Sequence, residues 1–420
     1  MCAVCTKNAR HACSACNGVY YCDREHQKED WKRHKSSCAP FKVQTDEILG
    51  RCLVATRNIK AGEIIMRKLP LILGPKTVSA ALCLGCHKKL NLEQSFRYDC
   101  SKCHWPLCNQ SCEETPLHMA ECEIFAKARY TPTVKNDNSK QSVYSCIAPL
   151  RALLLKVKEP SKFETLIKCQ SHLQEHLATQ VYQVLRRNLI PFFVNVLKFD
   201  TNEKEIMNIC SIFDTNCFEV RDTKGLVNVR GLYPVVSLLS HDCKHNTKHA
   251  FYGDDFQLVL TATIPIKKGD LITTTYTQTL WGTHMRRAHL KMSKHFDCVC
   301  ERCKDPTELG SYAGAIYCTR CKSVDRSNEN KIISCDPLDQ DANWKCEGCG
   351  YLVEGKEMIW GNEVLKKEIS QLDKKSPAAL ENFLVKYQGV LHSKNAHFLE
   401  VKYALCQMYG NLEGFQLVGK

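Results

Sequence analysis

The chain has 420 residues, a formal net charge of +13 and 28 cysteines. Its first residues contain no apolar segment of the kind that directs secretion, and no apolar run reaches the roughly 20 residues that a membrane-spanning helix needs. We therefore expect a protein of two or three domains in the cytoplasm, the nucleus or both. In that reducing environment, patterned cysteines are metal ligands rather than disulfides.

The first 38 residues carry eight candidate zinc ligands. Two Cys-x-x-Cys pairs have the spacing of zinc knuckles, in which a tight turn directs two sulfurs at one ion. The segment 22–38 is predicted as a helix, which places Cys22 and His26 one turn apart on one face, and likewise His34 and Cys38. Eight ligands are enough for two closed tetrahedral sites. They are Cys2, Cys5, Cys13, Cys16, Cys22, His26, His34 and Cys38.

A second set of eight ligands follows in the same order. Its helical part begins at Thr115-Pro116, which is typical of an N-cap followed by proline at the first helical position. Each structural zinc ion supplies on the order of 10 kcal/mol of folding free energy, so we expect neither module to fold without metal. The ligands of the second set are Cys83, Cys86, Cys100, Cys103, Cys108, Cys112, His118 and Cys122.

Two further groups of cysteines lie in the last third of the chain. Two Cys-x-x-Cys pairs separated by a loop predict a zinc ribbon, with Cys335 left over inside the loop. The ribbon ligands are Cys318, Cys321, Cys346 and Cys349. The segment CVCERC supplies three more thiolates, from Cys298, Cys300 and Cys303.

A closed structural zinc site needs four ligands, so the CVCERC segment needs a partner from elsewhere. His289 and His295 are near in sequence. Cys243 is the preferred candidate, because it follows an apolar run that we expect to be a core strand and that ends abruptly in polar residues. An ordinary buried thiol is the alternative interpretation of Cys243.

Zinc binding also changes how the net charge is interpreted. Six Zn²⁺ ions add 12 positive charges and 21 cysteine ligands add 21 negative ones, which lowers the formal net charge from +13 to +4. Direct binding of nucleic acid is therefore not expected. The other seven cysteines are predicted mostly as small buried side chains. They are Cys52, Cys146, Cys169, Cys210, Cys217, Cys335 and Cys406.

Strand-like and helical segments surround these cysteine groups. Residues 53–68 and 256–277 alternate and are rich in β-branched side chains, and each contains a Lys–Gly–acid turn that predicts a hairpin connection, at 59–65 and at 266–272. Helical periodicity runs through 149–159, and through 180–199 with Pro191 interrupting it.

The tail of the chain is also predicted to be helical. Ser376-Pro377 is typical of a cap and first-turn pair, and Gly389 of a helix end. A further helix is expected from 396 to near Gly410.

With these motifs, the chain resembles the SET and MYND family of protein-lysine methyltransferases over nearly its full length. With its additional N-terminal finger, the chain resembles the arthropod-specific branch of that family. The matching pieces are GRCLVATRNIKAGE, the zinc module at 83–122, NCFEV, GLYPVVSLLSHDCKHN, the strand ending at Tyr276, CVCERC, and LHSKNAHFLEVKYALCQMYGN.

The resemblance implies an α+β fold with a β-rich SET core. It implies an N-terminal MYND finger at 1–40, the SET N-terminal part at 45–78, an inserted MYND finger at 83–122, a helical insert at 123–205, the SET core at 206–297, a post-SET site and zinc ribbon at 298–360, and a short TPR-like helical region at 361–420. By the same resemblance, Cys2, Cys5, Cys22 and His26 share one zinc ion, Cys13, Cys16, His34 and Cys38 share another, and Cys243 completes the post-SET site.

The implied activity is transfer of a methyl group from S-adenosylmethionine to a lysine amine of a histone or another protein. Tyr276 corresponds to the catalytic tyrosine, and Asn246 closes a knot-like crossing beneath the cofactor. The implied partners are a protein substrate and, at the MYND fingers, proline-containing peptides. The implied cofactor-binding residues are Gly50, Arg51, Asn216, Ser237, Leu239, Ser240, His241, Tyr276 and Phe296.

Three positions depart from the family pattern. Cys52 stands where the first-strand turn usually has its second glycine, Ser240 replaces an asparagine, and Lys294 replaces a second active-site tyrosine. All three touch cofactor binding or turnover. The alternative interpretation is therefore a weakly active or inactive relative that acts as a zinc-dependent adaptor between proteins.

Overall fold

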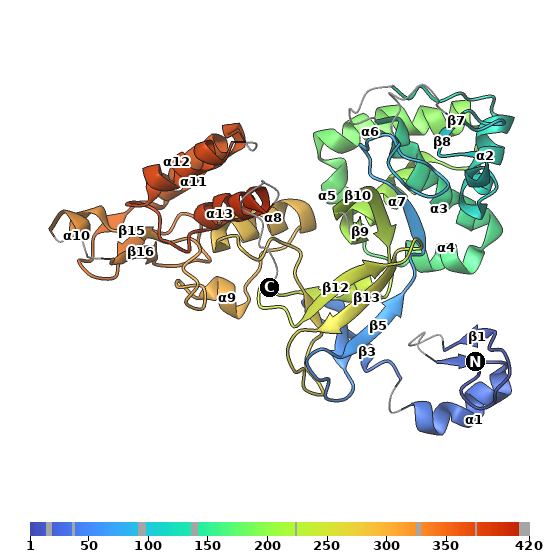
Figure 1. Ribbon diagram of the computed structural model, residues 1–420, viewed down its shortest axis with the longest axis horizontal. Helices are drawn as coiled ribbons and strands as arrows, with labels where there is room; N and C mark the ends of the chain where they lie inside the picture. The colour runs from blue at the N-terminus through green and yellow to red at the C-terminus, as the bar shows by residue number, and fades with distance from the viewer. Residues whose placement is uncertain are drawn as a thin grey trace. The chain divides into compact units, whose positions relative to one another are not determined.

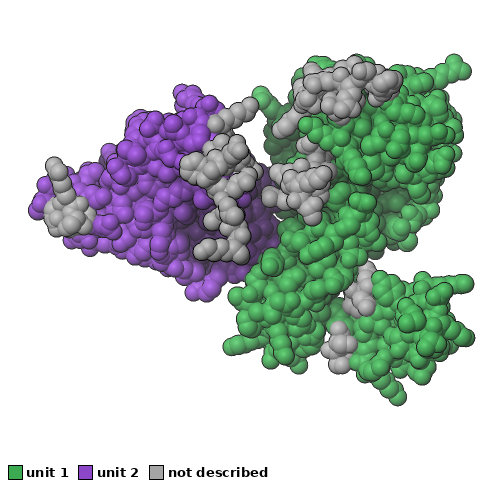
Figure 2. Space-filling view, in the orientation of Figure 1, with its two compact units in different colours: residues 1–240, 246–273 green, residues 241–245, 274–420 purple. Residues whose placement is uncertain are grey.

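The computed structural model describes residues 1–13, 19–35, 38–90, 98–135, 142–222, 225–324, 329–373 and 376–410. They form two compact units (Figure 2). Unit 1 comprises residues 1–240 and 246–273, and unit 2 comprises residues 241–245 and 274–420. Within the described ranges, no helix combines the length and the apolar character that crossing a membrane requires.

Several helices of unit 1 begin at a residue whose side chain caps the first turn. Thr115, Thr179 and Asn202 each accept a hydrogen bond from a backbone N–H of the first helical turn. The prediction for Thr115-Pro116 is thus confirmed. These helices are α1 (Arg24–His34), α2 (Pro116–Lys127), α3 (Ile147–Lys158), α4 (Pro160–Ile167), α5 (Leu173–Leu177), α6 (Gln180–Pro191) and α7 (Glu203–Asn216), with short helical turns at Gln110–Cys112, Ser142–Cys146 and Val236–Leu238.

The predicted helical segments of the insert are confirmed in α3 and α6. Pro191 is the last residue of α6, and the chain continues through a single π-helical turn at Phe192–Val196. A proline lacks the N–H that a regular helix uses, so the helical hydrogen-bond pattern changes from this point. Helix α7 runs across residue 205, where the helical insert was predicted to end.

The strands of unit 1 form small antiparallel sheets rather than one large one. In the described residues the orders are β3–β4, β12–β13–β5, β6–β10–β9, β1–β2 and β7–β8 (Figure 1). Their bounds are β1 (His11–Ala12), β2 (Tyr20–Tyr21), β3 (Phe41–Asp46), β4 (Gly50–Ala55), β5 (Ile64–Lys68), β6 (Ile72–Pro75), β7 (Tyr98–Asp99), β8 (Pro106–Leu107), β9 (Cys217–Asp222), β10 (Gly225–Leu232), β12 (Thr247–Tyr252) and β13 (Gln257–Ala262).

The two Lys–Gly–acid turns are present, but the prediction that they connect hairpins was wrong. Gly62 has φ +81° and Gly269 φ +93°, the left-handed backbone that the turn needs. However, β4 pairs with β3 and β5 pairs with β13, so the two arms of the first turn do not pair with each other. Instead Ile59 pairs with Ile266, which joins the two turn segments across about 200 residues of chain. The turn motif therefore specifies where the chain reverses, whereas burial against remote strands selects the partner.

We expected the apolar run before Cys243 to be a core strand, but the stretch 231–246 does not form a single strand. Strand β10 ends at Leu232, and a short helical turn and the two-residue strand β11 (Ser240–His241) follow. Leu232, Val236 and Leu239 are still buried. These buried residues are four and three residues apart, as on a helical turn, whereas a strand would bury every second residue.

Unit 2 contains a four-stranded antiparallel sheet and a set of helices. The sheet order is β15–β16–β17–β18. The predicted Ser376-Pro377 start of α12 and the end of α13 at Gly410 are confirmed. The elements are β14 (Thr273–Thr274, at the boundary between the units), α8 (Thr283–Lys294), α9 (Glu301–Lys304), β15 (Ile316–Tyr317), α10 (Thr319–Val324), β16 (Lys331–Ser334), β17 (Trp344–Cys346), β18 (Leu352–Val353), α11 (Gly355–Gln371), α12 (Pro377–Tyr387) and α13 (Ala396–Tyr409).

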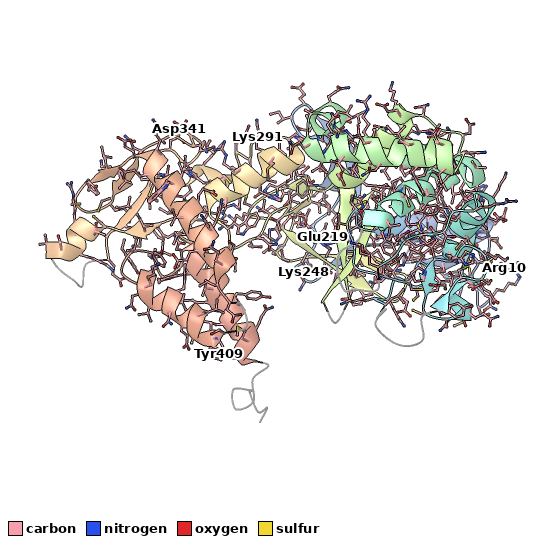
Figure 3. The ribbon with its side chains drawn as sticks, turned by 90° about the horizontal axis from the view of Figure 1, so that it is seen from above. Arg10, Glu219, Lys248, Lys291, Asp341 and Tyr409 are labelled. Atoms are coloured by element: carbon pink, nitrogen blue, oxygen red, sulfur yellow. The ribbon has the colours of Figure 1, made fainter. Side chains whose placement is uncertain are left out.

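Figure 3 marks surface positions on both units, with Glu219 on β9 and Lys248 on β12 in unit 1, and Lys291 on α8 and Tyr409 at the end of α13 in unit 2. Each unit has its own apolar clusters. In unit 1 they include Leu53, Ile65 and Leu258, and in unit 2 the helices α11 to α13 pack around Phe383 and Val401.

The expectation that the seven remaining cysteines are mostly buried was only partly right. Cys52, Cys146 and Cys210 are buried, Cys169 and Cys217 are half-buried, and Cys335 and Cys406 are exposed.

Candidate functional site

The inserted finger brings its eight predicted ligands into two groups of four. The short turn after β8 carries Cys112 of one group and helix α2 carries His118 and Cys122 of the other, and the ligands of the two groups alternate in pairs along the chain. The Cys86 and Cys108 sulfurs are 3.5 Å apart, and those of Cys100 and Cys122 are 3.7 Å apart. The first group is Cys83, Cys86, Cys108 and Cys112, and the second is Cys100, Cys103, His118 and Cys122.

The N-terminal finger has one complete group in the described residues, from Cys2, Cys5, Cys22 and His26. Asp23, the N-cap of α1, accepts a hydrogen bond from the backbone N–H of His26 and so starts the helix beside these ligands. For the other predicted group, the Cys13 and Cys38 sulfurs are 3.6 Å apart and His34 is buried. Cys16 lies outside the described residues.

In unit 2, Cys243 lies with the three cysteines of CVCERC, and its sulfur is 3.6 Å from that of Cys303. The alternatives His289 and His295 are not in that group. The ribbon cysteines form a further group, with Cys318 3.7 Å from Cys349 and Cys321 3.7 Å from Cys346.

Most distances within these groups fit zinc, the exception being the Cys22 sulfur, which lies 2.9 Å from Nδ1 of His26. A tetrahedral ion with Zn–S bonds of about 2.3 Å holds its sulfurs about 3.8 Å apart. The sulfur–sulfur distances are 3.5 to 3.7 Å, and the sulfurs of Cys5 and Cys103 lie 3.6 Å from the nitrogens of His26 and His118. His26 presents Nδ1 and His118 presents Nε2. The chemistry and the geometry of these groups fit zinc binding.

Sequence reasoning missed a buried arginine beside the Cys243 group. Arg286 on α8 is fully buried, and its Nε donates to the Cys243 sulfur at 3.2 Å. Its Nη1 pairs with Glu308 at 2.7 Å. Four thiolates around one Zn²⁺ carry a net charge of −2, so a buried cation at this place offsets part of that charge. An arginine one helical turn after a Gly–Thr start was the only local signal.

A second missed arginine lies against the inserted finger. Arg151 on α3 donates to both carboxylate oxygens of Glu121, at 2.7 and 2.8 Å. It also donates to the Leu73 and Leu84 carbonyls and to Nε2 of His87, so all five of its N–H groups have an acceptor. Burial lowers the pKa of His87, which keeps its imidazole neutral and able to accept. Glu121 also lies 3.9 Å from Nδ1 of His118, one of the predicted zinc ligands.

The predicted cofactor-binding residues divide between the two units. In unit 2, His241, Tyr276 and Phe296 lie together, with ring centroids 5.3 Å apart for His241 and Tyr276 and 5.9 Å apart for His241 and Phe296. Burial raises the pKa of Tyr276 to about 12 and lowers that of His241 to about 4. At neutral pH the cluster is therefore an uncharged phenol beside an uncharged imidazole.

In unit 1, two of the predicted residues reach the same short segment. Arg51 donates to the Lys168 carbonyl, and Asn216 donates to the Gln170 carbonyl at 2.6 Å. Gly50 has φ +67°, a left-handed backbone that favours glycine. The others are Ser237, which donates to the Pro234 carbonyl, Leu239, which is buried, and Ser240 on β11.

Asn246 connects two distant segments of the chain in unit 1. Its side-chain amide donates to the Leu271 carbonyl and accepts from the Thr273 backbone, both at 2.8 Å. The side chain thus pairs with the passing segment as a strand would.

Two of the three departures have a visible place. Cys52 is buried, and its sulfur contacts the Gln44 carbonyl on β3 at 3.5 Å. Burial raises the pKa of this thiol. The Lys294 ammonium lies over the ring of Tyr276, 5.8 Å from its centroid, so a cation already occupies one face of that ring.

Comparison with known families agrees with this architecture. The MYND finger model matches residues 2–38, and the SET domain model matches residues 50–277, which is more than half of the chain. This chain belongs to the SET and MYND family. The SET match includes β4, the helical insert, the crossing at Asn246 and Tyr276.

Curated relatives of this SET–MYND protein come from animals and plants. It is 30% identical to the SET domain-containing protein SmydA-8, isoform A, of Drosophila melanogaster, over 73% of this chain and 64% of that protein. It is 28% identical to the histone-lysine N-methyltransferase ASHR1 of Arabidopsis thaliana, over 79% and 67%. The chain thus spans 64% and 66% of the two SmydA-8 isoforms, less than two thirds of their length.

Among solved structures, the SET domain of LSMT bound to lysine and AdoHcy covers 91% of this chain and 88% of its own. The sequence identity is 12% and the TM-score 0.31, which is too low for a residue-by-residue comparison.

Proposed function

We propose that this SET–MYND protein is a protein-lysine N-methyltransferase that uses S-adenosylmethionine. The observation that carries the proposal is the SET match together with a half-buried, uncharged tyrosine beside His241 at the position expected for catalysis. The substrate is a lysine of a histone or another protein, and the MYND fingers are proposed to bind proline-containing peptides.

The first requirement of the reaction is a neutral lysine amine. From a reference pKa near 10.4, removing the proton at pH 7 costs about 4.6 kcal/mol in water. The apolar side chains around Tyr276 and the Lys294 ammonium over its ring both disfavour a charged lysine there. They therefore lower the cost of deprotonating an amine that binds at this place. The Tyr276 hydroxyl is proposed to orient the amine, because a phenol that stays protonated at neutral pH both donates and accepts a hydrogen bond.

The aromatic cluster also suits the cofactor. S-adenosylmethionine supplies the methyl group on a sulfonium cation, and the face of an aromatic ring attracts cations. The Lys294 ammonium over Tyr276 is an example within the chain itself. We assign cofactor binding to Gly50, Arg51, Asn216, Ser237, Leu239, Ser240, His241, Tyr276 and Phe296.

Isothermal titration calorimetry of the zinc-loaded protein with S-adenosylmethionine tests the proposal. We expect saturable binding with a Kd between about 1 µM and 1 mM, the usual range for enzyme substrates. Phe296→Ala is expected to weaken binding, whereas Phe383→Leu, a conservative core change in the α11–α13 cluster, is the matched control. Absence of binding at millimolar cofactor removes the enzyme proposal.

Metal content provides a separate prediction. We expect about six zinc ions per chain by elemental analysis, and five in Cys243→Ser, because a site reduced to three thiolates binds zinc more weakly. Cys335→Ser is the matched control, since Cys335 is exposed and belongs to none of the described clusters. A full complement of zinc in purified Cys243→Ser would contradict the ligand assignment.

The second candidate function is a zinc-dependent adaptor without methyl transfer. Lys294 favours it, because its ammonium already lies over one face of the Tyr276 ring and would repel a lysine that arrives in its charged form. Full zinc content, binding of a proline-containing peptide and no heat of S-adenosylmethionine binding together would identify the adaptor.

A further inference from the structure

His241 connects the Cys243 metal group to the backbone of Tyr276. Its Nε2 lies 3.2 Å from the Cys243 sulfur, and its Nδ1 lies 3.0 Å from the backbone nitrogen of Tyr276. Both ring nitrogens are thus engaged, each with a different segment of the same unit.

The partners determine where the imidazole proton lies. A backbone N–H can only donate, so Nδ1 must be the accepting nitrogen. In a neutral imidazole the proton is then on Nε2, which faces the sulfur. A metal-bound cysteine is a thiolate without a proton, so its sulfur accepts this hydrogen bond. The tautomer that holds Tyr276 therefore presents its N–H to Cys243, and the metal-bound thiolate is the form of Cys243 that accepts this bond most strongly.

The surroundings keep both ends of this link in place. Arg286 donates to the same sulfur at 3.2 Å and is itself paired with Glu308. The imidazole ring packs against Tyr276 and Phe296. The Asp242 backbone N–H donates to the Thr274 carbonyl at 3.0 Å, which fixes the two segments next to the link.

We propose that His241 is a positioning residue through which the Cys243 metal site orients the backbone of Tyr276. The catalytic consequence rests on the proposed methyltransferase function, whereas the structural coupling does not. A displacement of about 1 Å at a reacting group costs on the order of 100-fold in rate. A contact that fixes the backbone of Tyr276 is therefore expected to affect kcat.

Two substitutions of His241 separate the two contacts. In His241→Asn the amide oxygen takes the place of Nδ1, so the acceptor for Tyr276 is kept and the donor to Cys243 is lost. In His241→Gln the amide nitrogen takes the place of Nε2, so the donor to the sulfur is kept and the acceptor for Tyr276 is lost. His245→Asn is the matched control, because the buried Nδ1 of His245 has no hydrogen-bond partner among the described residues.

The first measurement needs no activity. In zinc-loaded protein carrying ¹⁵N-labelled histidine and tyrosine, we expect the proton of His241 on Nε2. We also expect the Tyr276 amide resonance to shift in His241→Gln and on zinc removal, but to shift less in His241→Asn. Zinc release to a chelator is expected to be about tenfold faster in His241→Asn and unchanged in His245→Asn.

The second measurement is the kinetics of methyl transfer. Both His241 variants lower kcat, and we expect His241→Gln to lower it about tenfold more than His241→Asn, with a similar KM for the protein substrate in both. A proton on Nδ1, or a Tyr276 amide resonance indifferent to His241→Gln, overturns the coupling. If the unmodified protein transfers no methyl group, the proposed function fails, but the resonance and zinc-release measurements still decide the coupling.

Discussion

Replacing Tyr276 with phenylalanine is expected to lower the kcat of methyl transfer by at least about 100-fold. The ring keeps its packing against His241, because the change removes only the hydroxyl. Burial holds the pKa of this phenol at about 12, so the lost group is a neutral hydroxyl and no charge changes at neutral pH. The decrease in kcat would therefore reflect poorer alignment of the lysine amine. Transfer of a labelled methyl group from S-adenosylmethionine to a lysine-containing protein measures it.

The matched control is Tyr233→Phe, which removes the hydroxyl of a fully buried tyrosine. Its hydroxyl donates to the Phe256 carbonyl at 2.6 Å in unit 1. Losing this bond is expected to lower the free energy of unfolding by about 1–2 kcal/mol and to leave kcat within a few-fold. Zinc content should be unchanged in both variants. Retention of full kcat in Tyr276→Phe would exclude the catalytic role, since the control separates that role from a general loss of stability.

Replacing Arg151 with methionine is expected to lower the free energy of unfolding by about 3–5 kcal/mol. Glu121 has no exposed surface and would be left as a buried, unpaired carboxylate. The Leu73 and Leu84 carbonyls would lose their donor as well. Denaturant unfolding in zinc-saturated buffer, followed by circular dichroism, measures the change.

Two further variants make this test specific. In Arg151→Met/Glu121→Gln the unpaired charge is absent, so we expect the double variant to recover about half of the loss. Arg186→Met breaks an exposed ion pair with Glu203, whose atoms are 2.6 Å apart, and is expected to cost less than about 1 kcal/mol. Equal costs for Arg151→Met and Arg186→Met would show that the buried network does not stabilise the inserted finger.

Signals confined to a few residues were predicted well. The caps at Thr115 and Ser376 and the helix end at Gly410 are where the sequence indicated them. Zinc spacing is equally local, because a Cys-x-x-Cys turn or an i,i+4 pair already presents two ligands to one ion. The preference for Cys243 over His289 and His295 agrees with the group that the structure forms, although it came from ligand counting and a strand that does not exist.

Features that depend on distant parts of the chain were not predictable in the same way. The Lys–Gly–acid motifs specified two turns but not the pairing of Ile59 with Ile266. Nothing in the sequence distinguishes the Nδ1 contact of His26 from the Nε2 contact of His118, because the ring orientation follows from the packing of the helix that carries it. Arg151 lies in an apolar helical segment and gave no sign of its acceptors, which come from three other elements.

The sequence by itself determined the family, most of the cysteine and histidine groups that the structure brings together, and the starts or ends of several helices. These properties depend on the chemistry of neighbouring residues, and neighbouring residues are always close in space. The tertiary structure alone decided which strands pair, which nitrogen of each histidine faces a sulfur, and which buried arginines neutralise the charge around the metal groups. These properties depend on groups tens to hundreds of residues apart, which meet only after burial of apolar surface has brought their elements together.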